Sequence, residues 1–435
     1  MSDHSVRRIT VLCLFSVATA MPALAGTWST PVVLGTNAYS GSVTIDAAGN
    51  LTSVWYQNTV NEIWASTAAF GHPWSAPVNI SGAVSPGSPI VRGSTSGNAT
   101  AIYTTSTSTG TYVDHLAGGN WGAPGPTNGV DQFYVSNDKG DEGLAWSTGG
   151  ARPTSSTIDA VQRPAGGTWS LASTVATGVH LAFDGSVMVP DGSMAVAWES
   201  FDSVCGERVC KTSNWVLHVS TRAAGAQSWV DSGALLGPGA TQHFVQLAAD
   251  GAGDLGLVGL AGGNIVSRVR HGGSWSTTAV VASTSAVGFY TGTGHDNRVF
   301  ASDSAGHATL VSWNTGLTSI VAVDGNLTTN TWGAVTAISG PDQNPNYFDY
   351  AMSSTGTAIV FWSIAGNGGN TIWRAATRSG PGVAWNAPAT AGTSYEGGGV
   401  PDSVAVNDAG EAAVVFHGYS SDFLTFFQYT NVYHP

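Results

Sequence analysis

Three histidines stand in short polar stretches that lead into apolar runs. His180 lies in GVHLAFD, His243 in TQHFVQ, and His295 in TGHDNRVF, where Asp296 follows it directly. Imidazole groups can exchange protons near neutral pH, form hydrogen bonds or bind a divalent metal. No H-E-x-x-H spacing accompanies them, so we predict no metal site and no cofactor, and keep a divalent metal as the alternative. The G-x-S-x-G motif is also absent, which argues against a Ser-His-Asp triad.

Carboxylates and phenols occupy similar stretches elsewhere in the chain. Asp131 and Tyr134 lie in DQFYVS, Tyr347 and Asp349 in NPNYFDY, and Glu396 in YEGGGV. Together with the histidines, these groups can bind a sugar through hydrogen bonds and ring stacking, or support acid–base chemistry at a glycosidic centre. Each of them can also be an ordinary polar loop residue.

A long polar segment follows Trp198 and Glu199 and contains Cys205 and Cys210 in SVCGERVC. This spacing predicts a disulfide across a hairpin tip, because no second Cys or His pair at metal-ligand spacing accompanies it. A stapled, acidic loop beside an aromatic residue is a candidate specificity element, so Trp198 and Glu199 join the candidate ligand-binding residues. The alternative is a long hairpin that needs the disulfide to stay folded.

A repeated hairpin pattern in the sequence predicts the strands that position these residues. TIDAAGNLTSVW (residues 44–55) reads as two apolar runs around a tight turn, and PDGSMAVAWES, SDSAGHATLVSW and NDAGEAAVVF repeat the pattern. Asp, Asn or Ser usually stands three residues before the turn glycine and can close a type I turn, so Asp46, Asp250 and Asp303 are predicted turn residues rather than calcium ligands. The turn glycines are Gly49, Gly97, Gly140, Gly192, Gly253, Gly306, Gly356 and Gly410.

A second repeated feature, a tryptophan in a short strand as in TWSTPVVL and PWSAPVNI, alternates strictly with these turns. Each unit of roughly 50 residues has room for four strands, which is typical of a β-propeller blade. We therefore predict an all-β fold: a single β-propeller of eight four-stranded blades, with seven as the alternative if one unit is irregular. The N-terminal strand is expected to complete the last blade. The strand tryptophans are Trp28, Trp74, Trp121, Trp169, Trp229, Trp275, Trp332 and Trp385.

The eight other tryptophans fit the same frame. Five end second strands and three fall on third strands, and such repeated positions favour packing between blades over a row of sugar-binding platforms. In a propeller, the loops that enter the inner strands share one face with the loops that join second and third strands. The candidate residues are therefore expected around one mouth of the central channel. The eight are Trp55, Trp146, Trp198, Trp313, Trp362, Trp64, Trp215 and Trp373.

The alternation of W-S-x-P strands with D-x-x-G hairpins resembles that of secreted bacterial β-propeller repeat proteins. SDSAGHATLVSW is similar to the Asp box of sialidase-type propellers, but its Asp303-to-Gly306 spacing is one residue too long. The arginine triad of sialidases cannot be identified, so the similarity to that family is distant. The resemblance implies the propeller fold and leaves the activity open, because one fold hosts many functions.

The N-terminal residues predict export. Arg7 and Arg8 precede an apolar stretch, and Ala23-Leu24-Ala25 forms a cleavage pattern, so residues 1–25 are a predicted signal peptide and residues 26–435 the propeller domain. We expect a periplasmic or secreted protein, monomeric and without a transmembrane segment. The net charge of −13 disfavours nucleic acid as a partner.

Three functions remain open from the sequence. The first is a binding protein for a neutral glycan or an exported protein partner, which the lack of a catalytic motif favours. The second is a carbohydrate-active enzyme, a glycoside hydrolase or polysaccharide lyase, that uses histidine, tyrosine and carboxylate groups at the same mouth. The third is a structural scaffold.

Overall fold

The computed structural model describes residues 26–82, 87–104, 110–127, 133–148, 155–205, 210–239, 242–288, 299–340, 344–395, 401–419 and 425–435. Throughout these ranges the chain forms β-strands, one short 3₁₀ turn, η1 (Asn367–Gly369), and no α-helix. None of the described elements is a helix long and apolar enough to cross a membrane. The predicted signal peptide lies outside the described residues.

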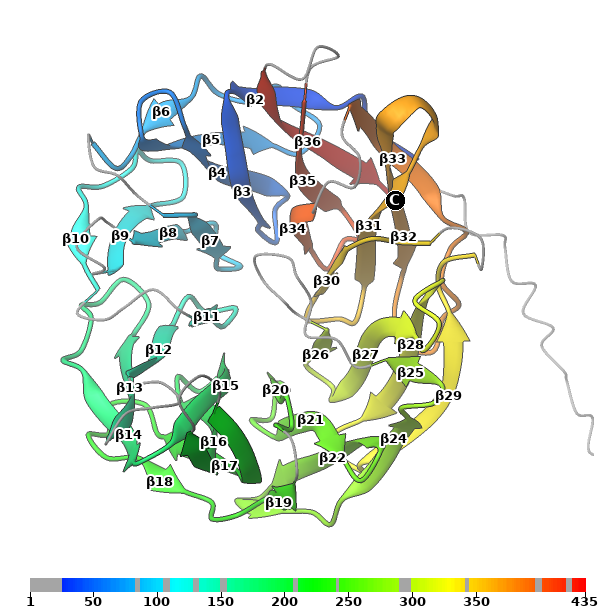
Figure 1. The fold of residues 1–435 in the computed structure, drawn as a ribbon. Coiled ribbons are helices and arrows are strands. Elements are labelled where there is room, and N and C mark those ends of the chain that lie inside the picture. The colour runs from blue at the N-terminus through cyan, green and yellow to red at the C-terminus, as the bar shows by residue number, and fades with distance from the viewer. Residues whose placement is uncertain are drawn as a thin grey trace, which may run out of the picture.

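The strands form eight four-stranded antiparallel blades arranged in a ring around a central channel, which confirms the predicted fold (Figure 1). The inner strands of blades 1 to 8 are β3 (Ala38–Ile45), β7 (Ile90–Gly93), β11 (Phe133–Ser136), β15 (Leu181–Met188), β20 (Gln246–Ala249), β26 (Phe300–Ser302) with β25 (Val287–Gly288), β30 (Phe348–Met352) and β34 (Pro401–Val406). The second strands are β4 (Asn50–Gln57), β8 (Ala99–Thr104), β12 (Glu142–Thr148), β16 (Met194–Cys205), β21 (Leu255–Ala261), β27 (His307–Asn314), β31 (Ala358–Ala365) and β35 (Ala412–Tyr419).

The outer half of each blade follows in the same order. The third strands are β5 (Glu62–Ala69), β9 (Gly110–His115), β13 (Ser156–Arg163), β17 (Cys210–Arg222), β22 (Asn264–His271), β28 (Ile320–Asn326), β32 (Asn370–Arg378) and β36 (Phe426–His434). The outermost strands are β6 (Val78–Asn79), β10 (Gly125–Pro126), β14 (Ser173–Gly178), β18 (Val230–Asp231) with β19 (Leu236–Gly239), β23 (Ser274–Trp275) with β24 (Ala279–Ser283), β29 (Thr331–Ala337), β33 (Ala389–Tyr395), and β1 (Thr27–Trp28) with β2 (Val32–Thr36).

The two ends of the chain close the ring in blade 8. Strands β1 and β2 both pair antiparallel with β36, and Trp28 lies opposite Tyr433. The rings of these two residues are 5.4 Å apart. The N-terminal strand thus covers the edge of the C-terminal strand, as predicted, and removes an exposed pairing site.

The hairpins between inner and second strands have the predicted turn chemistry. Asp46 Oδ1 accepts hydrogen bonds from the backbone N–H groups of Ala48 (2.9 Å) and Asn50 (2.7 Å). Asp303 Oδ1 binds the backbone in the same way. The glycine that ends the turn has a φ of 82° in both hairpins, the left-handed region that glycine adopts at low cost. These aspartates are turn residues, which confirms the interpretation from the sequence.

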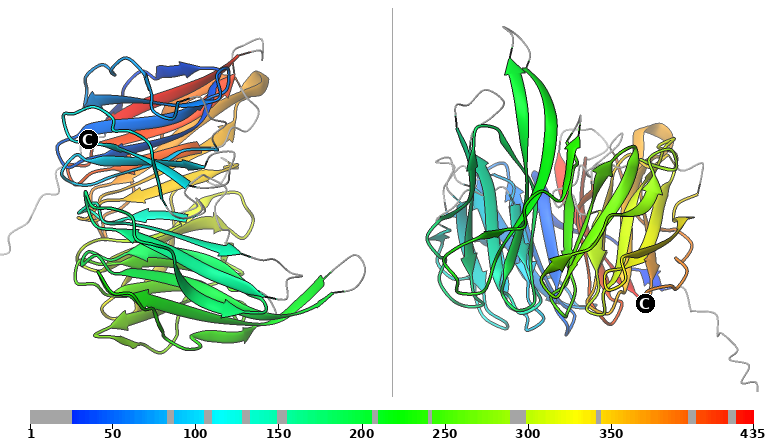
Figure 2. Two further views of the ribbon diagram at one scale, coloured as in Figure 1. Left: turned by 90° about the vertical axis from the view of Figure 1, so that its left-hand side faces the viewer. Right: turned by 90° about the horizontal axis from the view of Figure 1, so that it is seen from below.

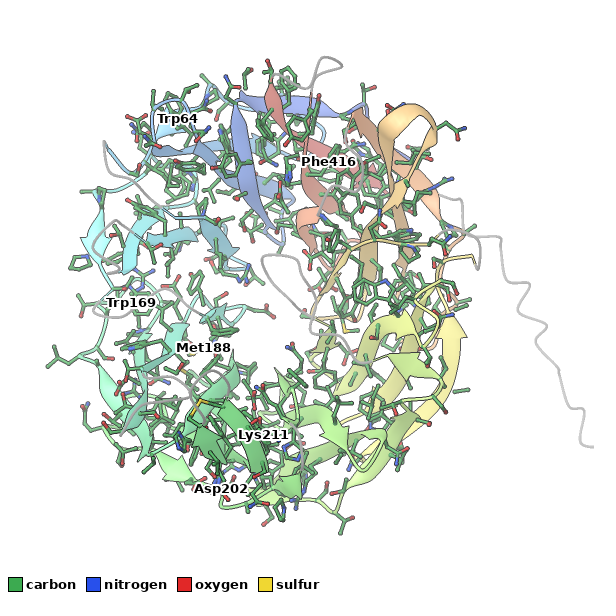
Figure 3. The ribbon with its side chains drawn as sticks, viewed as in Figure 1. Trp64, Trp169, Met188, Asp202, Lys211 and Phe416 are labelled. Atoms are coloured by element: carbon green, nitrogen blue, oxygen red, sulfur yellow. A yellow bond between two sulfur atoms is a disulfide. The ribbon has the colours of Figure 1, made fainter. Side chains whose placement is uncertain are left out.

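The hydrophobic core consists of layers between neighbouring blades. In β16, Ala195 and Ala197 pack toward blade 5, whereas Val196 and Trp198 pack toward blade 3. Both faces of the strand are buried, so the alternation of apolar and polar residues is lost there. The five tryptophans that end second strands are all buried, which confirms their predicted packing role. Figure 3 labels Trp169 at the outer part of blade 3.

Three arginines connect adjacent blades and lie against tryptophans that precede the outer strands, whereas the sequence predicts these tryptophans within the strands. Arg163 of blade 3 donates to Asp114 (2.8 Å) of blade 2 and to Glu142 of its own blade. Its guanidinium lies 5.2 Å from the centroid of the Trp169 ring, close enough for a cation–π contact. Arg222 and Arg378 lie against Trp229 and Trp385 in the same manner. The repeat therefore also encodes a polar contact between blades.

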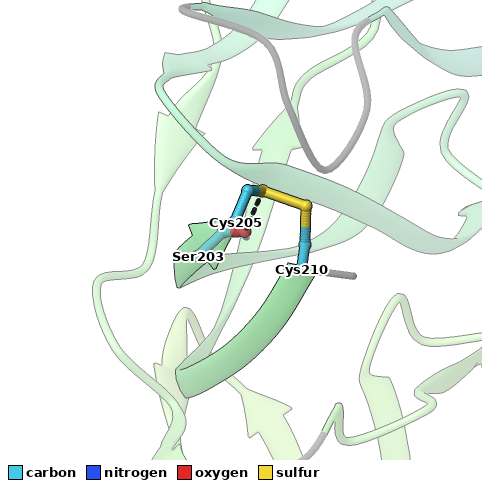
Figure 4. The surroundings of a disulfide bond; sticks show 3 residues. All are labelled: Ser203, Cys205 and Cys210. Atoms are coloured by element: carbon cyan, nitrogen blue, oxygen red, sulfur yellow. Dashed lines mark hydrogen bonds between the residues drawn. A yellow bond between two sulfur atoms is a disulfide. The ribbon is translucent and has the colours of Figure 1, made fainter. Parts of the chain in front are cut away.

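The two faces of the ring differ in their loops. Inner strands begin at one face, here called the entry face, and end in the glycine hairpins at the other, the turn face. Strands β16 and β17 extend well beyond their blade on the entry face, opposite the C-terminus (Figure 2). Cys205 and Cys210 pair opposite each other in this hairpin and form the predicted disulfide (Figure 4).

Candidate functional site

A cavity of about 510 Å³ occupies the channel between the inner strands of blades 2 to 7. A volume of this size is typical of small-ligand sites. Phe133 lines it at the start of β11, and Asp184 and Ser186 line it from β15. Both strands begin at the entry face, so the polar wall of blade 4 lies below the loops where the sequence placed the candidate residues.

Two carboxyl groups meet in this wall. Asp184 belongs to a bulge in β15, where the pairing with β16 shifts between Phe183 and Gly185. The bulge brings its side chain into hydrogen-bond contact with Glu199 of β16, whose side chain is fully buried. Burial raises the pKa of Asp184 well above its ordinary value of 3.8, and the negative charge of Glu199 raises it further. Asp184 therefore keeps its proton to a higher pH than an exposed aspartate does.

Blade 5 supplies the partners of this carboxyl pair. Glu199 Oε1 accepts a hydrogen bond from the backbone N–H of His243 (3.0 Å) and also contacts Nδ1 of the same residue. The amide of Gln242 donates to Asp184 Oδ1 at 2.6 Å, which partly offsets the increase in the pKa of Asp184. His243 is only 2% exposed, so it is held within the blade 4–blade 5 contact. Two of the candidate residues, Glu199 and His243, are thus brought together.

Aromatic side chains gather near the entry-face ends of the strands of blades 3 and 4. His180 stacks on Phe201 with ring centroids 5.4 Å apart, and Phe201 stacks on Trp215 at 4.1 Å. Phe133 of blade 3 lies 4.3 Å from Phe183 of blade 4. We call these five residues, together with Phe244, the aromatic rim.

Two members of the rim are notably open to solvent: Phe133 is 40% exposed and Phe244 is 39% exposed. Phe244 also has a φ of 51°, a strained conformation for a bulky residue. Strained residues and exposed aromatic residues both occur preferentially at binding sites. Because the two features coincide next to His243, this side of the mouth is the strongest candidate surface.

The other candidates are placed apart from this group. Trp198 is 8% exposed, stacks on His218 at 4.1 Å and donates a hydrogen bond to Ser220. It therefore packs between blades 3 and 4, and we no longer assign it as a ligand contact. Asp349 is also assigned to packing between blades, because it is buried and its Oδ2 accepts a hydrogen bond from the backbone N–H of Val404 in blade 8 (3.0 Å).

Two tyrosines complete the placement. The buried hydroxyl of Tyr134 donates to Glu142 (2.5 Å), although the residue also lines the channel. Tyr347 is half-buried in the loop that enters blade 7, three blades round the ring from blade 4 (Figure 1). Neither joins the carboxyl pair. The candidates outside the described residues are Asp131, His295, Asp296 and Glu396.

Several residues of the site were not singled out by their sequence. Asp184 stands in LAFDGS, where an Asp-Gly step inside a strand pattern is a signal for a bulge. Phe133 and Phe244 lie directly beside the candidates Tyr134 and His243, but the period of a strand does not tell which of two neighbours faces the mouth. No group of three or more His, Cys, Asp or Glu side chains among the described residues has a metal-binding arrangement.

The comparisons with known proteins concern the fold. No protein-family model matches the chain, and no curated protein matches it. Among solved structures, it is similar to the BP39L lectin from Burkholderia pseudomallei, with a TM-score of 0.49 and 9% identity over 82% of this chain and 100% of that chain. It is also similar to a mutant of the Aleuria aurantia lectin in complex with Fucα1-6GlcNAc, with a TM-score of 0.39 and 13% identity over 82% of this chain and 96% of that chain.

A further similar structure is the polysaccharide lyase Uly1, with a TM-score of 0.45 and 9% identity over 90% of this chain and 89% of that chain. Identities this low concern the β-propeller architecture alone. The function must therefore be argued from the side chains at the mouth.

Proposed function

We propose that this is an exported binding protein that recognises a neutral glycan at the entry-face mouth of the central channel, beside blades 3 to 5. The observation that carries the proposal is the aromatic rim around a polar channel wall. Aromatic faces cover the apolar face of a sugar ring, while carboxyl and imidazole groups accept and donate hydrogen bonds to its hydroxyls. An extracytoplasmic protein partner is the alternative occupant of the same surface.

Three further features support the proposal. The resemblance to secreted bacterial propeller proteins and the predicted signal peptide favour a location outside the cytoplasm, where extracellular glycans occur. The Cys205–Cys210 disulfide fits an oxidising compartment. The acidic net charge of −13 disfavours strongly anionic polysaccharides as ligands.

The geometry fits a carbohydrate-active enzyme less well. Glycosidases place two carboxyl groups about 5 Å or more apart, on either side of the scissile bond. Asp184 and Glu199 are hydrogen-bonded directly to each other, which leaves no room for a glycosidic bond between them. We therefore treat turnover as an outcome to be tested rather than as the leading function.

A glycan-array screen with the purified protein, with and without a chelator, tests the proposal. We expect saturable binding to a defined glycan and, by mass spectrometry, recovery of that glycan unchanged. The variant Phe133→Ser should lose most of the binding because it removes an exposed rim residue. Leu171→Ser is the matched control, since Leu171 is 83% exposed beyond the outer strand of blade 3. A blank array, or equal binding by both variants, would overturn the proposal, and release of shortened sugars would favour the enzyme.

A further inference from the structure

A second cavity, of about 580 Å³, lies at the outer edge of the ring, where β2 and β36 of blade 8 face residues 71–77 of blade 1 (Figure 1). Trp74 lines this cavity and is half-buried. Leu34 and Leu51 also line it and are buried, so the cavity reaches inward to the apolar layer between the two blades. None of the described residues that line it also lines the central channel.

The repeat explains why this space lies in blade 1. In each blade, one residue of the third strand pairs with the second residue after the turn glycine and lies beside the tryptophan of the same blade. In blades 2 to 8 this residue is His115, Arg163, Arg222, Arg270, Gly325, Arg378 and Tyr433. Blade 1 has Ala68 at this position, opposite Leu51 and in the same apolar cluster as Trp74. No long side chain therefore extends beside Trp74.

Blade 6 shows how a propeller blade closes such a gap. Its residue at the same position is Gly325, and the ring of Trp332 lies 2.6 Å from the place that a Cβ atom on Gly325 would occupy. Trp332 also donates a hydrogen bond to Ser267 of blade 5 (2.7 Å), which fixes the ring there. In blade 1, by contrast, Trp74 borders an open cavity.

The charges found between other blades are also missing from this cavity. In blade 3, Arg163 pairs with Glu142 and with Asp114 of blade 2. Leu51 stands at the position of Glu142 and Val432 at that of Asp114, and both line the cavity. The described lining residues include no Asp, Glu, Lys or Arg, and their polar groups are hydroxyl, amide and imidazole groups. A charged ligand would meet no carboxylate, ammonium or guanidinium group here, so the cavity favours an uncharged ligand.

We propose that this cavity, which we call the edge site, is a second sugar-binding site in which one neutral sugar ring packs against Trp74. The inference rests on the proposed glycan binding and adds a site to it. The indole ring offers an apolar surface to the C–H groups of a sugar, and the imidazoles of His72 and His434 can form hydrogen bonds with its hydroxyls. Because the edge site lies at the outer strands and the mouth at the inner strands, one chain can hold two glycans at once.

Fluorine NMR of the protein labelled with 5-fluorotryptophan tests the edge site. The probes are the methyl glycosides of glucose, galactose, mannose, fucose and N-acetylglucosamine. The signal of Trp74, assigned with Trp74→Phe, should shift saturably with at least one of them. The signal of Trp362, which is fully buried in blade 7, should not shift. Phe133→Ser, which removes a residue of the mouth, should leave the shift of Trp74 unchanged.

Two surface variants form a matched pair that does not disturb the core. Val33 lines the edge site and is 47% exposed, whereas Val78 is 45% exposed on the neighbouring strand β6 and is not among the described lining residues. Val33→Ser should weaken the binding that the Trp74 signal reports about fourfold, as expected for the loss of one apolar contact. Val78→Ser should leave it unchanged. Equal effects of the two variants would contradict a ligand in the cavity.

The failures of the two proposals can be told apart. If a glycoside binds the native protein while the Trp74 signal stays unchanged, the edge site is wrong and the proposed function stands. If the Trp74 signal instead changes with protein concentration alone, the cavity receives a second copy of this chain, which also refutes the sugar site. If the Trp74 signal shifts and Phe133→Ser loses no glycan binding, the edge site stands and the mouth is wrong. If neither the glycosides nor the glycan array shows binding, both proposals are wrong.

Discussion

Asp184 and Glu199 hydrogen-bond to each other through their carboxyl groups in the channel wall of blade 4. Burial and the negative charge of Glu199 raise the pKa of Asp184, so the contact favours the protonated form of Asp184. A protein with two apolar residues at these positions would be more stable than one with this buried acidic pair, because burial of carboxyl groups is unfavourable. Such a destabilising arrangement is more readily explained by binding than by stability.

The first prediction concerns the pH dependence of stability. Burial and Glu199 raise the pKa of Asp184 in the folded protein, so its contribution to stability is full at pH values below its ordinary pKa of 3.8. That contribution is lost as the pH rises through the raised pKa. Asp184→Asn removes the titration, so the melting temperature of the variant relative to the native protein should increase steadily from pH 4.5 to pH 8. A difference that stays constant or decreases with pH would contradict the raised pKa of Asp184.

The second prediction separates two of the inter-blade arginines. Arg163 faces buried Glu142, and Arg163→Met leaves that carboxylate without its cation, which should cost about 3–5 kcal/mol of unfolding free energy. Arg222 bonds to the neutral groups of Gln162 and Ser173, so Arg222→Met should cost only about 1–2 kcal/mol. Urea unfolding of both variants at pH 7 measures the difference.

A pH series adds a check on the cause. Burial raises the pKa of Glu142, and Arg163 opposes that increase. Without Arg163 the folded-state pKa of Glu142 rises further, so the destabilisation by Arg163→Met should be larger at pH 8 than at pH 5. Equal losses from both arginine variants, independent of pH, would show that the lost ring contacts dominate instead.

Much of the fold could be predicted because its signals are local and repeated. The turn residue Asp46 and its glycine three positions later specify a hairpin through contacts within five residues. Eight such hairpins alternating with eight tryptophans leave little choice of architecture. The closure of blade 8 could also be predicted, because a strand motif with a tryptophan precedes the first hairpin and none follows the last one.

The site could be predicted only in part, because it depends on contacts between distant residues. Glu199 and His243 were chosen as loop residues, yet both are buried against each other, and no local pattern reveals a contact across 44 positions. Asp184 reaches Glu199 through a bulge, which shifts the side chain relative to a regular strand. Trp198 does not contact the site because β16 is buried on both of its faces, and this burial depends on how blades 3, 4 and 5 pack together.

The third prediction concerns the long hairpin. The disulfide closes a very short loop, and the chain-entropy relation gives about 2 kcal/mol for it. Because the ends of β16 and β17 that carry the disulfide extend beyond the blade, loss of the disulfide should affect local opening rather than unfolding of the ring. The double variant Cys205→Ser with Cys210→Ser should keep the melting temperature of the native protein. Amide hydrogen exchange at Val204 and Thr212 should become about 30-fold faster.

This third prediction has an internal control in the same blade. Amides of Val196 and Val219, which lie in the packed part of β16 and β17, should keep their protection. A lowered melting temperature together with faster exchange in that packed part would show that the disulfide stabilises the blade as a whole. Reduction with a thiol reagent should reproduce the effect of the double variant.

The last prediction distinguishes rim aromatics from packing aromatics. Phe133 is 40% exposed, so Phe133→Ser should change the unfolding free energy by only about 0.5 kcal/mol while it removes most glycan binding. Trp362 is fully buried in blade 7, and Trp362→Ala should cost about 3–5 kcal/mol because it leaves a large cavity. The Trp362→Ala variant should lose binding only because part of it unfolds. At a temperature well below its thermal transition, where most of it is folded, it should bind the glycan with native affinity. If Phe133→Ser destabilised the protein as strongly as Trp362→Ala, the rim would be part of the core, and the surface assigned to the glycan would not exist.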